Sequence, residues 1–140
     1  MNISMINRLR EQILSELENI EWIAEIHDWI PKKFWWFPSI FFTFDRIESN
    51  VSDSNHHERV YYFTINLFQE TTTLWNIQSE KNLCELLDNV IDGFDRSDLW
   101  WLTTHIEAVW GNIQAVETDN WPALHWIVLL WIHIPFTLSM

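Results

Sequence analysis

The chain has 140 residues, of which 48% are apolar and 20% are charged, and 20 acidic against 8 basic residues give it a net charge of −12. This length and apolar fraction predict one folded domain over residues 1–140 and argue against intrinsic disorder. The acidic balance argues against tight DNA binding, because a protein that neutralises phosphates needs the opposite charge.

Aromatic residues are unusually frequent, with 11 Trp, 9 Phe and 2 Tyr. Each buried aromatic side chain removes about 150–250 Å² from water, so this set exceeds what one small core needs. Tryptophan is also enriched where subunits meet, so the surplus indicates surfaces that contact other proteins. The alternative is that Trp replaces Leu and Phe as ordinary core filler.

The lone cysteine, Cys84, excludes a disulfide within the chain and a zinc site built from cysteines. It lies in an apolar helical pattern, which indicates a small buried side chain. The first residues, MNISMINRLREQ, lack the apolar run of a signal peptide.

An apolar stretch over residues 121–138 (WPALHWIVLLWIHIPFTL) raises the question of a membrane span. Two histidines and two prolines interrupt it, and no Lys or Arg follows Arg96 to flank it. The uninterrupted run over residues 126–132 has the length of a strand. A buried strand and no membrane contact are therefore predicted.

The first predicted element is an amphipathic helix. Its apolar residues recur every three or four positions and share one face: Ile6, Leu9, Ile13, Leu17 and Ile20. Asn2 or Ser4 is its predicted N-cap. Residues 22–30 (WIAEIHDWI), closed by Pro31, favour a short strand, with a continuation of the helix as the alternative.

Two segments rich in aromatic and β-branched residues predict an antiparallel pair of strands, at residues 37–45 (FPSIFFTFD) and 60–69 (VYYFTINLFQ). In the second segment, one face consists of Tyr61, Phe63, Ile65 and Leu67. The segment between them, residues 46–59, is polar and rich in Ser and Asn, which predicts a mobile connecting loop.

A second helix is predicted from Ser79, its N-cap, to Gly93, which is well placed to end it. Its apolar stripe consists of Leu83, Leu87, Val90 and Phe94. Residues 95–104 predict a short helical turn that presents Trp100 and Trp101. Residues 105–117 and 123–136 predict two further strands, and a helix is the alternative for the first of these segments.

The predicted order is thus helix, three strands, helix and two strands. Strands that do not alternate one by one with helices favour an α+β fold, with a mostly antiparallel sheet of four to five strands and two helices packed on one face. The last strand is apolar on both faces, with Ile127, Leu129 and Trp131 on one and Val128, Leu130 and Ile132 on the other. Because both helices are expected on one face, we expect a neighbouring subunit to cover the other.

Motifs of catalysis and of nucleotide or metal binding are absent from the sequence, including the GxSxG, P-loop, GxGxxG, HExxH and EF-hand patterns. The adjacent His56 and His57 diverge in a polar segment, and His27 and His105 have no recognisable partner. On one strand face, His125 and His133 would lie about 26 Å apart, too far to hold one ion.

Carboxylate pairs such as Asp92 with Asp95 and Glu16 with Glu18 occupy ordinary polar positions. Cys84 has no base predicted beside it to make it a nucleophile. We therefore expect no enzyme activity and no cofactor, and we predict no catalytic, cofactor-binding or metal-binding residue.

The order of these elements resembles the tail terminator and head–tail joining proteins of tailed bacteriophages. Three phrases mark the resemblance: FWWFPSIFFTF at residues 34–44, where a proline precedes an apolar strand, YYFTINLFQE at 61–70, and SEKNLCELLDNVID at 79–92. The resemblance extends from Ile6 to Phe136. It implies a small α+β subunit that forms a ring, commonly a hexamer, which caps the tail tube and joins it to the neck beneath the capsid.

The resemblance implies a protein of the virion tail or neck that assembles in the host cytoplasm. Its expected partners are copies of itself, the tail tube protein and the neck or connector proteins. DNA would pass through an acidic channel without specific binding, since six copies carry a total charge of about −72. The alternatives are another neck or tail-completion protein, an acidic adaptor that binds a basic partner as a monomer or dimer, and a small enzyme.

Overall fold

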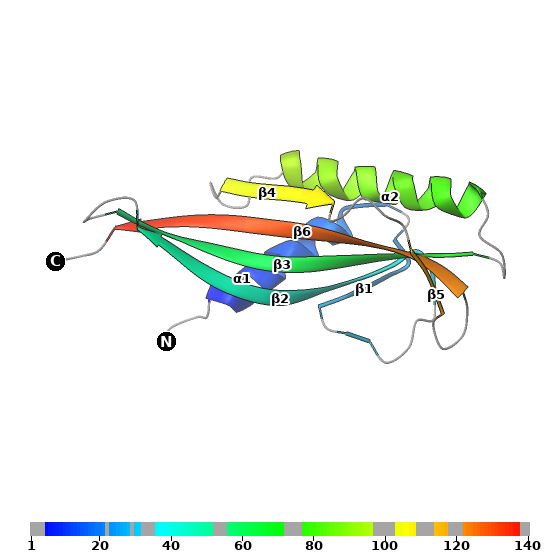
Figure 1. The fold of residues 1–140 in the computed structure, drawn as a ribbon, viewed down its shortest axis with the longest axis horizontal. Helices are drawn as coiled ribbons and strands as arrows, with labels where there is room; N and C mark the ends of the chain where they lie inside the picture. Colours follow the sequence, from blue (N-terminus) through cyan, green and yellow to red (C-terminus); the bar gives the residue numbers. More distant parts are fainter. Residues whose placement is uncertain are drawn as a thin grey trace.

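A computed structural model describes residues 5–21, 23–28, 30–31, 36–51, 56–71, 77–96, 103–108, 114–117 and 122–137. These residues form two helices and six strands, shown in Figure 1. In chain order the elements are α1 (Met5–Glu18), β1 (Glu25–His27), β2 (Ser39–Val51), β3 (His56–Glu70), α2 (Ile77–Arg96), β4 (Thr103–Ala108), β5 (Gln114–Glu117) and β6 (Pro122–Thr137).

The strands form one sheet in the order β1-β2-β3-β6-β4, and β5 also pairs with β6. Only the short pairing of β1 with β2 is parallel. β5 and β4 lie one after the other along the same edge of β6, opposite residues 122–125 and 128–133. Because β4 and β5 share one edge, the six described strands make a sheet that is five strands wide. The predicted α+β fold with a mostly antiparallel sheet is confirmed.

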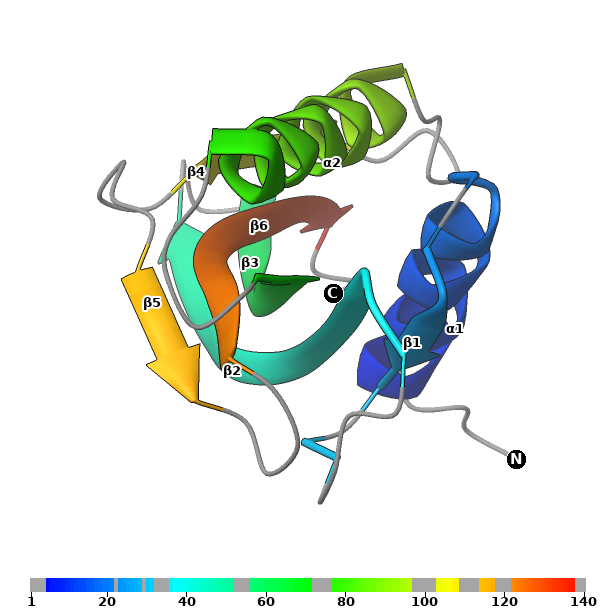
Figure 2. The ribbon, with the colours of Figure 1, turned by 90° about the vertical axis from the view of Figure 1, so that its right-hand side faces the viewer.

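Both helices pack on one face of this sheet, as predicted. The α1 stripe of Leu9, Ile13 and Leu17 is fully buried, and so are Leu83, Val90 and Phe94 of α2. These side chains share one apolar core with residues of β2, β3 and β6. Figure 2, which looks along the strands, shows both helices outside the curled sheet. Burial of each Leu, Ile or Phe side chain contributes about 1.5–3 kcal/mol, so this shared core holds the two layers together.

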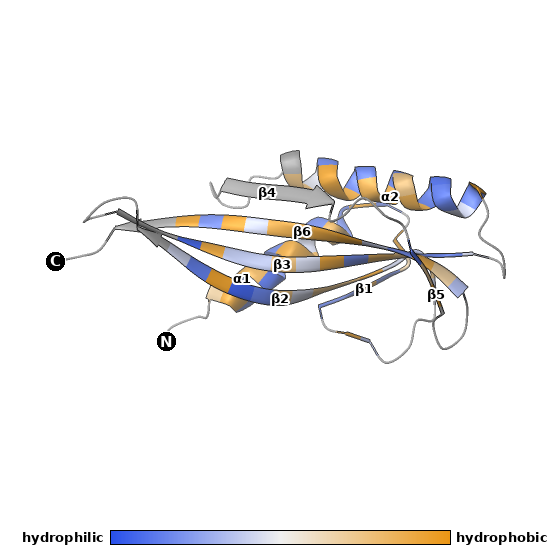
Figure 3. Ribbon diagram, viewed as in Figure 1, coloured by the Kyte–Doolittle hydropathy of each residue, from blue (hydrophilic) through white to orange (hydrophobic). Residues whose placement is uncertain are grey.

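The apolar periodicity of both helices matches their contacts. Along α2, polar and apolar residues alternate in the hydropathy colouring of Figure 3, because one stripe meets the sheet and the other meets solvent. α1 ends at Glu18, and hydrogen bonds from Asn19 and Ile20 back to the carbonyl groups of Glu16 and Leu17 close its last turn. The strand predicted within residues 22–30 is confirmed in the shorter β1, and the predicted caps of α1, Asn2 and Ser4, lie outside the described residues.

The connection between β2 and β3 is much shorter than predicted. β2 continues to Val51 and β3 begins at His56, so most of the segment predicted as a loop over residues 46–59 lies in a paired β-ladder. The prediction of a long mobile loop is wrong for these positions, because cross-strand backbone hydrogen bonds stabilise a polar hairpin without an apolar alternation. Residues 52–55 lie outside the described residues.

The ends of α2 also differ from the prediction. The helix begins at Ile77, so Ser79 lies in its first turn and is not the N-cap. It continues through Gly93 to Arg96, because Phe94 extends the buried stripe four positions beyond Val90. The predicted end at Gly93 is therefore wrong.

The segment after α2 is partly described. The predicted turn covered residues 95–104. Its first two residues end α2 and its last two begin β4, whereas Trp100 and Trp101 lie outside the described residues. The strand predicted over residues 105–117 is divided between β4 and β5, and its positions 109–113 also lie outside the described residues. The helical alternative is wrong for the described positions. The strand predicted over residues 123–136 is confirmed in β6.

Candidate functional site: the helix-free face of the sheet

The face of the sheet opposite α1 and α2 is the candidate functional surface. Residues opposite one another in the ladders point to the same side, so the register defines this helix-free face. Its central members are Phe41, Thr43, Arg46 and Glu48 of β2, Tyr62, Thr64, Asn66 and Phe68 of β3, and His125, Ile127, Leu129, Trp131 and His133 of β6.

The two faces of β6 differ in burial. Val128, Leu130 and Ile132 on the helix side are 0% exposed. On the helix-free side, Ile127, Leu129 and Trp131 are only half-buried. The predicted division of this strand into two apolar faces is confirmed, and the described part of the chain leaves the second face partly open. Partly exposed apolar side chains grouped on one face indicate a binding surface.

A polar and aromatic cluster occupies one end of the helix-free face. The guanidinium of Arg46 lies 4.1 Å from the centre of the Tyr62 ring, and Tyr62 packs edge-to-face on Trp131 at 5.9 Å. Glu48 accepts a 2.8 Å hydrogen bond from the Tyr62 hydroxyl and a 3.1 Å bond from Nε of Arg46. Arg46 also donates a 2.6 Å bond to Asp45, the residue at the bulge between β2 and β3. The charges of Asp45, Arg46 and Glu48 are thus paired with one another.

These contacts keep the cluster in one protonation state. The hydrogen bond from Tyr62, followed by that from Arg46, lowers the pKa of Glu48. The same bond to Glu48, together with burial, raises the pKa of Tyr62. At neutral pH the cluster therefore holds a neutral hydroxyl donor, an ionised carboxylate and a guanidinium.

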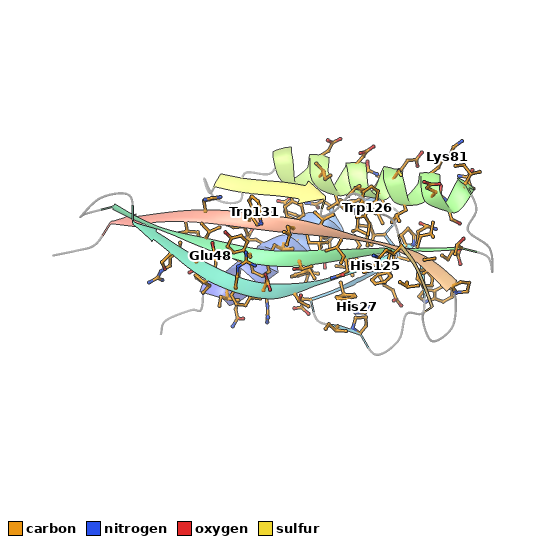
Figure 4. All side chains as sticks on the ribbon, viewed as in Figure 1. His27, Glu48, Lys81, His125, Trp126 and Trp131 are labelled. Carbon is orange, nitrogen blue, oxygen red and sulfur yellow. The ribbon has the colours of Figure 1, made fainter. Side chains whose placement is uncertain are left out.

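The other end of the face is an aromatic stack. Phe68 lies between Phe41, at a centroid distance of 5.6 Å, and the imidazole of His125, at 4.4 Å. Nε2 of His125 lies 2.9 Å from Oδ1 of Asn66, so this nitrogen donates a hydrogen to the amide oxygen. Burial lowers the pKa of His125, which favours the neutral imidazole. Figure 4 shows where His125, Trp131 and Glu48 lie on the strands.

The middle of the helix-free face is uncharged on the three central strands. Acidic residues of these strands lie toward its two ends, with Glu48 and Glu58 at one end and Glu70 at the other. On the flanking strands, Glu107 of β4 lies opposite Leu129, and Glu25 of β1 lies opposite Ser39. The helix-free face therefore shares the acidic character of the chain, and α2 adds Glu85, Asp88 and Asp92 on its exposed side.

The histidines are not assembled into a metal site within the described residues. His125 and His133 lie eight residues apart on the same strand, and His27 contacts Glu25 at 3.4 Å on β1. No three His, Cys, Asp or Glu side chains of the described part come close enough together to hold a metal ion. The side chains of His56, His57 and His105 lie outside that part.

The remaining candidate groups lie on the helices. Cys84 is half-buried on α2, and burial, followed by the charges of Glu80 and Asp88, raises the pKa of its thiol. A thiol with a raised pKa is a poor nucleophile at neutral pH. Glu16 and Glu18 belong to α1 and Asp92 to α2, whereas the side chain of Asp95 lies outside the described part.

Three of the 11 Trp side chains are described, and they occupy three different environments. Trp36 is 69% exposed before β2, Trp126 packs against the core on the helix side, and Trp131 lies on the helix-free face. Of these three, only Trp126 fills the core.

The sequence did not predict the cluster of Arg46, Glu48 and Tyr62, because Arg46 and Glu48 were predicted to lie in a loop.

No helix in the described part of the chain combines the length and the apolar character needed to cross a bilayer. Comparison with known protein families finds none whose pattern matches the chain. Comparison with curated protein sequences likewise finds no match. The helix-free face and the order of the elements are therefore the features that indicate a function.

Proposed function

We propose that this chain is a structural protein of a tailed-bacteriophage virion that assembles into a ring of six. The ring caps the tail tube and joins it to the neck and head. The observation that carries the proposal is the helix-free face, where Ile127, Leu129 and Trp131 are only half-buried in a single chain. Such a surface is stabilised when another protein covers it, and a ring provides each copy with a neighbour.

The fold supports the same assignment. The resemblance implies a small α+β subunit in which a helix precedes the first strands and a second helix precedes the last ones. The observed order, α1 β1 β2 β3 α2 β4 β5 β6, has that arrangement. Fold alone does not specify function, so this agreement adds to the surface argument and does not replace it.

The charge distribution supports passage of DNA without binding. The exposed carboxylates of Glu85, Asp88 and Asp92 lie on the outer side of α2, on the other side of the sheet from the helix-free face. A ring that contacts its neighbours through the helix-free face leaves these acids of α2 free to face a channel. An acidic channel wall repels the phosphates of DNA and prevents the DNA from sticking.

An acidic adaptor that binds a basic protein is the second candidate. The exposed acids on α2 favour it, since a basic partner is attracted to a surface of the opposite charge. Such a partner leaves the apolar helix-free face uncovered, which is why the ring is preferred. The two functions differ in self-association: the ring protein forms a closed oligomer, whereas the adaptor stays a monomer or dimer.

The test is the oligomeric state of the purified protein, measured by native mass spectrometry and negative-stain electron microscopy over a range of concentrations. We expect a closed ring with six times the 17.0 kDa mass of one chain. The same sample is imaged with purified tail tubes of the phage that encodes the chain, where the ring is expected at one tube end. A chain that remains monomeric alone and on tail tubes contradicts the proposal.

A further inference from the structure

The outer edge of β2 is open along most of its length. β1 pairs with this edge only at residues 39–41, and no other described strand pairs with it. Residues 45–49 are all exposed, and Ile47 among them is 42% exposed. The backbone N–H and C=O groups that point outward from such an edge can pair with a strand of another chain.

The segment before these exposed residues increases the tendency of the edge to pair. Residues 39–44 (SIFFTF) carry no charge and have high β-propensity, which is typical of segments that aggregate by strand pairing. Ile40 and Phe42 are fully buried in the core, whereas Phe44 is partly buried. A strand that paired with the exposed part of β2 would continue along this apolar segment.

A β-bulge interrupts the edge at the boundary between the two segments. Phe44 lies opposite Phe63 and Arg46 lies opposite Tyr62, so Asp45 is an extra residue with no partner in the ladder. A bulge bends its strand and increases the local twist, and both ribbon views show β2 strongly curved (Figures 1 and 2). A straight strand cannot follow a bent edge, so backbone pairing across the bulge is interrupted.

The charged side chains at the bulge oppose the same contact. The side chains of Asp45, Arg46 and Glu48 remain roughly half exposed, and Arg46 forms ion pairs with both acids. A strand laid along the edge removes water from these groups, which costs free energy unless the strand supplies matching charges. A second β2 in parallel register does not supply them, since it places like charges opposite one another.

We infer that the bulge at Asp45, together with the charges of Arg46 and Glu48, protects the open edge of β2 from pairing with a strand of another chain. These features lie where the uncharged segment 39–44 meets the exposed residues 45–49. The inference goes beyond the proposed ring and does not depend on it, because an open edge is prone to pairing in a monomer and in a ring subunit alike.

Deletion of Asp45 is the first test, since it removes the extra residue and leaves every cross-strand pair of the register in place. The deletion variant should associate at a concentration about tenfold or more below that of the unmodified chain, because several cross-strand pairs form at once. Light scattering measures the association, and hydrogen exchange should show residues 46–49 protected in the associated form. Asp88→Asn removes one acid from the exposed side of α2 and is the matched control for charge.

A second substitution separates edge pairing from a loss of stability. Ile47→Lys in the deletion variant places a charge on the open edge, so it should restore the association behaviour of the unmodified chain. Ile77→Lys in the deletion variant is the matched control. Ile77 is 64% exposed on α2, so lysine there leaves the edge unchanged and the association should persist. Aggregation through partial unfolding would respond alike to the two lysines.

Circular dichroism shows whether the deletion variant folds. If it does not, a triple variant takes its place in the same measurements, with threonine at Asp45, Arg46 and Glu48. Threonine suits a strand and removes the charges, so this variant should also associate more readily, and Ile47→Lys should reverse the effect.

Three outcomes overturn the inference. They are a folded variant that associates no more readily than the unmodified chain, association that Ile77→Lys reverses as well as Ile47→Lys does, and an associated form in which residues 46–49 exchange as fast as in the unmodified chain. In each case a ring formed by the unmodified chain leaves the proposed function standing. If the unmodified chain forms no ring in solution or on tail tubes, the proposed function fails and the protection of the edge is still decided by these variants.

Discussion

The hydroxyl of Tyr62 donates a 2.8 Å hydrogen bond to Glu48, which lies diagonally across the ladder between β2 and β3. Diagonal neighbours in a sheet come within reach only when a long side chain spans the gap, as the tyrosine ring does here. The bond connects two residues 14 positions apart and keeps the carboxylate ionised next to the Arg46 guanidinium.

Tyr62→Phe removes this bond, so the pKa of Glu48 should rise toward its ordinary value, as measured by NMR titration of the Glu48 side chain. A carboxylate whose pKa is lower in the folded state contributes stability at neutral pH that is lost as pH falls through that value. The variant should therefore be slightly less stable at neutral pH and unchanged in strong acid. Tyr61→Phe, which changes a buried tyrosine on the opposite face, is the control. An unchanged pKa of Glu48 in Tyr62→Phe contradicts this role of the bond.

His125 should make the fold sensitive to mild acid. Burial lowers its pKa in the folded state, so the unfolded chain binds the proton first as pH falls below about 6.5. Stability is then fully present above the unfolded pKa and decreases as pH falls toward the folded one. His125→Phe keeps a ring to stack on Phe68 and should lose less stability than the unmodified chain between pH 7.5 and 5.5 in urea unfolding. Equal losses in the two proteins would show that His125 does not titrate with unfolding.

Gly93→Ala should stabilise the protein by about 0.5–1 kcal/mol, because glycine inside a helix costs conformational entropy. The added methyl group meets the Ile20 side chain at 3.7 Å, an ordinary contact distance, so no clash offsets the gain. Chemical denaturation with urea measures the change. Leu83→Ala, which opens a cavity at a buried position of the same helix, should instead destabilise by about 2–5 kcal/mol. A lower free energy of unfolding in Gly93→Ala would show that this position does not tolerate a side chain.

Duplex DNA should not bind the isolated protein at physiological salt. Several phosphate contacts require a matching set of Lys and Arg on one face, and the chain has 8 basic residues against 20 acidic ones. Fluorescence anisotropy of a labelled duplex tests this, with a basic DNA-binding domain as the positive control. Binding that weakens steeply with added salt would indicate a basic surface and contradict an acidic channel wall.

The helices and strands whose apolar residues recur at a regular spacing were predictable from the sequence. The stripe of Leu9, Ile13 and Leu17 repeats with the helical period, and the alternation along β6 separates Leu129 from Leu130. Each pattern reports which side chains turn toward a core, so the burial of these residues follows from their spacing. The α+β class then follows from the order of the elements.

The length of the hairpin and the polar cluster were not predictable in the same way. Arg46 and Glu48 lie on strand β2 at the edge beyond β1, where polar side chains face solvent and no apolar alternation marks the strand. Their pairing with Tyr62 depends on a bulge that shifts the register between Phe44 and Arg46. A one-residue shift moves every later side chain to the other face, and a single sequence does not reveal it.

The position of β6 determines when the chain can fold. It is the last strand along the described chain, yet it lies inside the sheet, between β3 on one edge and β4 and β5 on the other. During synthesis, the earlier strands and both helices leave the ribosome before their central strand exists. Their apolar faces stay uncovered in the meantime, and contacts between distant segments form slowly. The nascent chain is therefore exposed to aggregation and to chaperones until its last strand emerges.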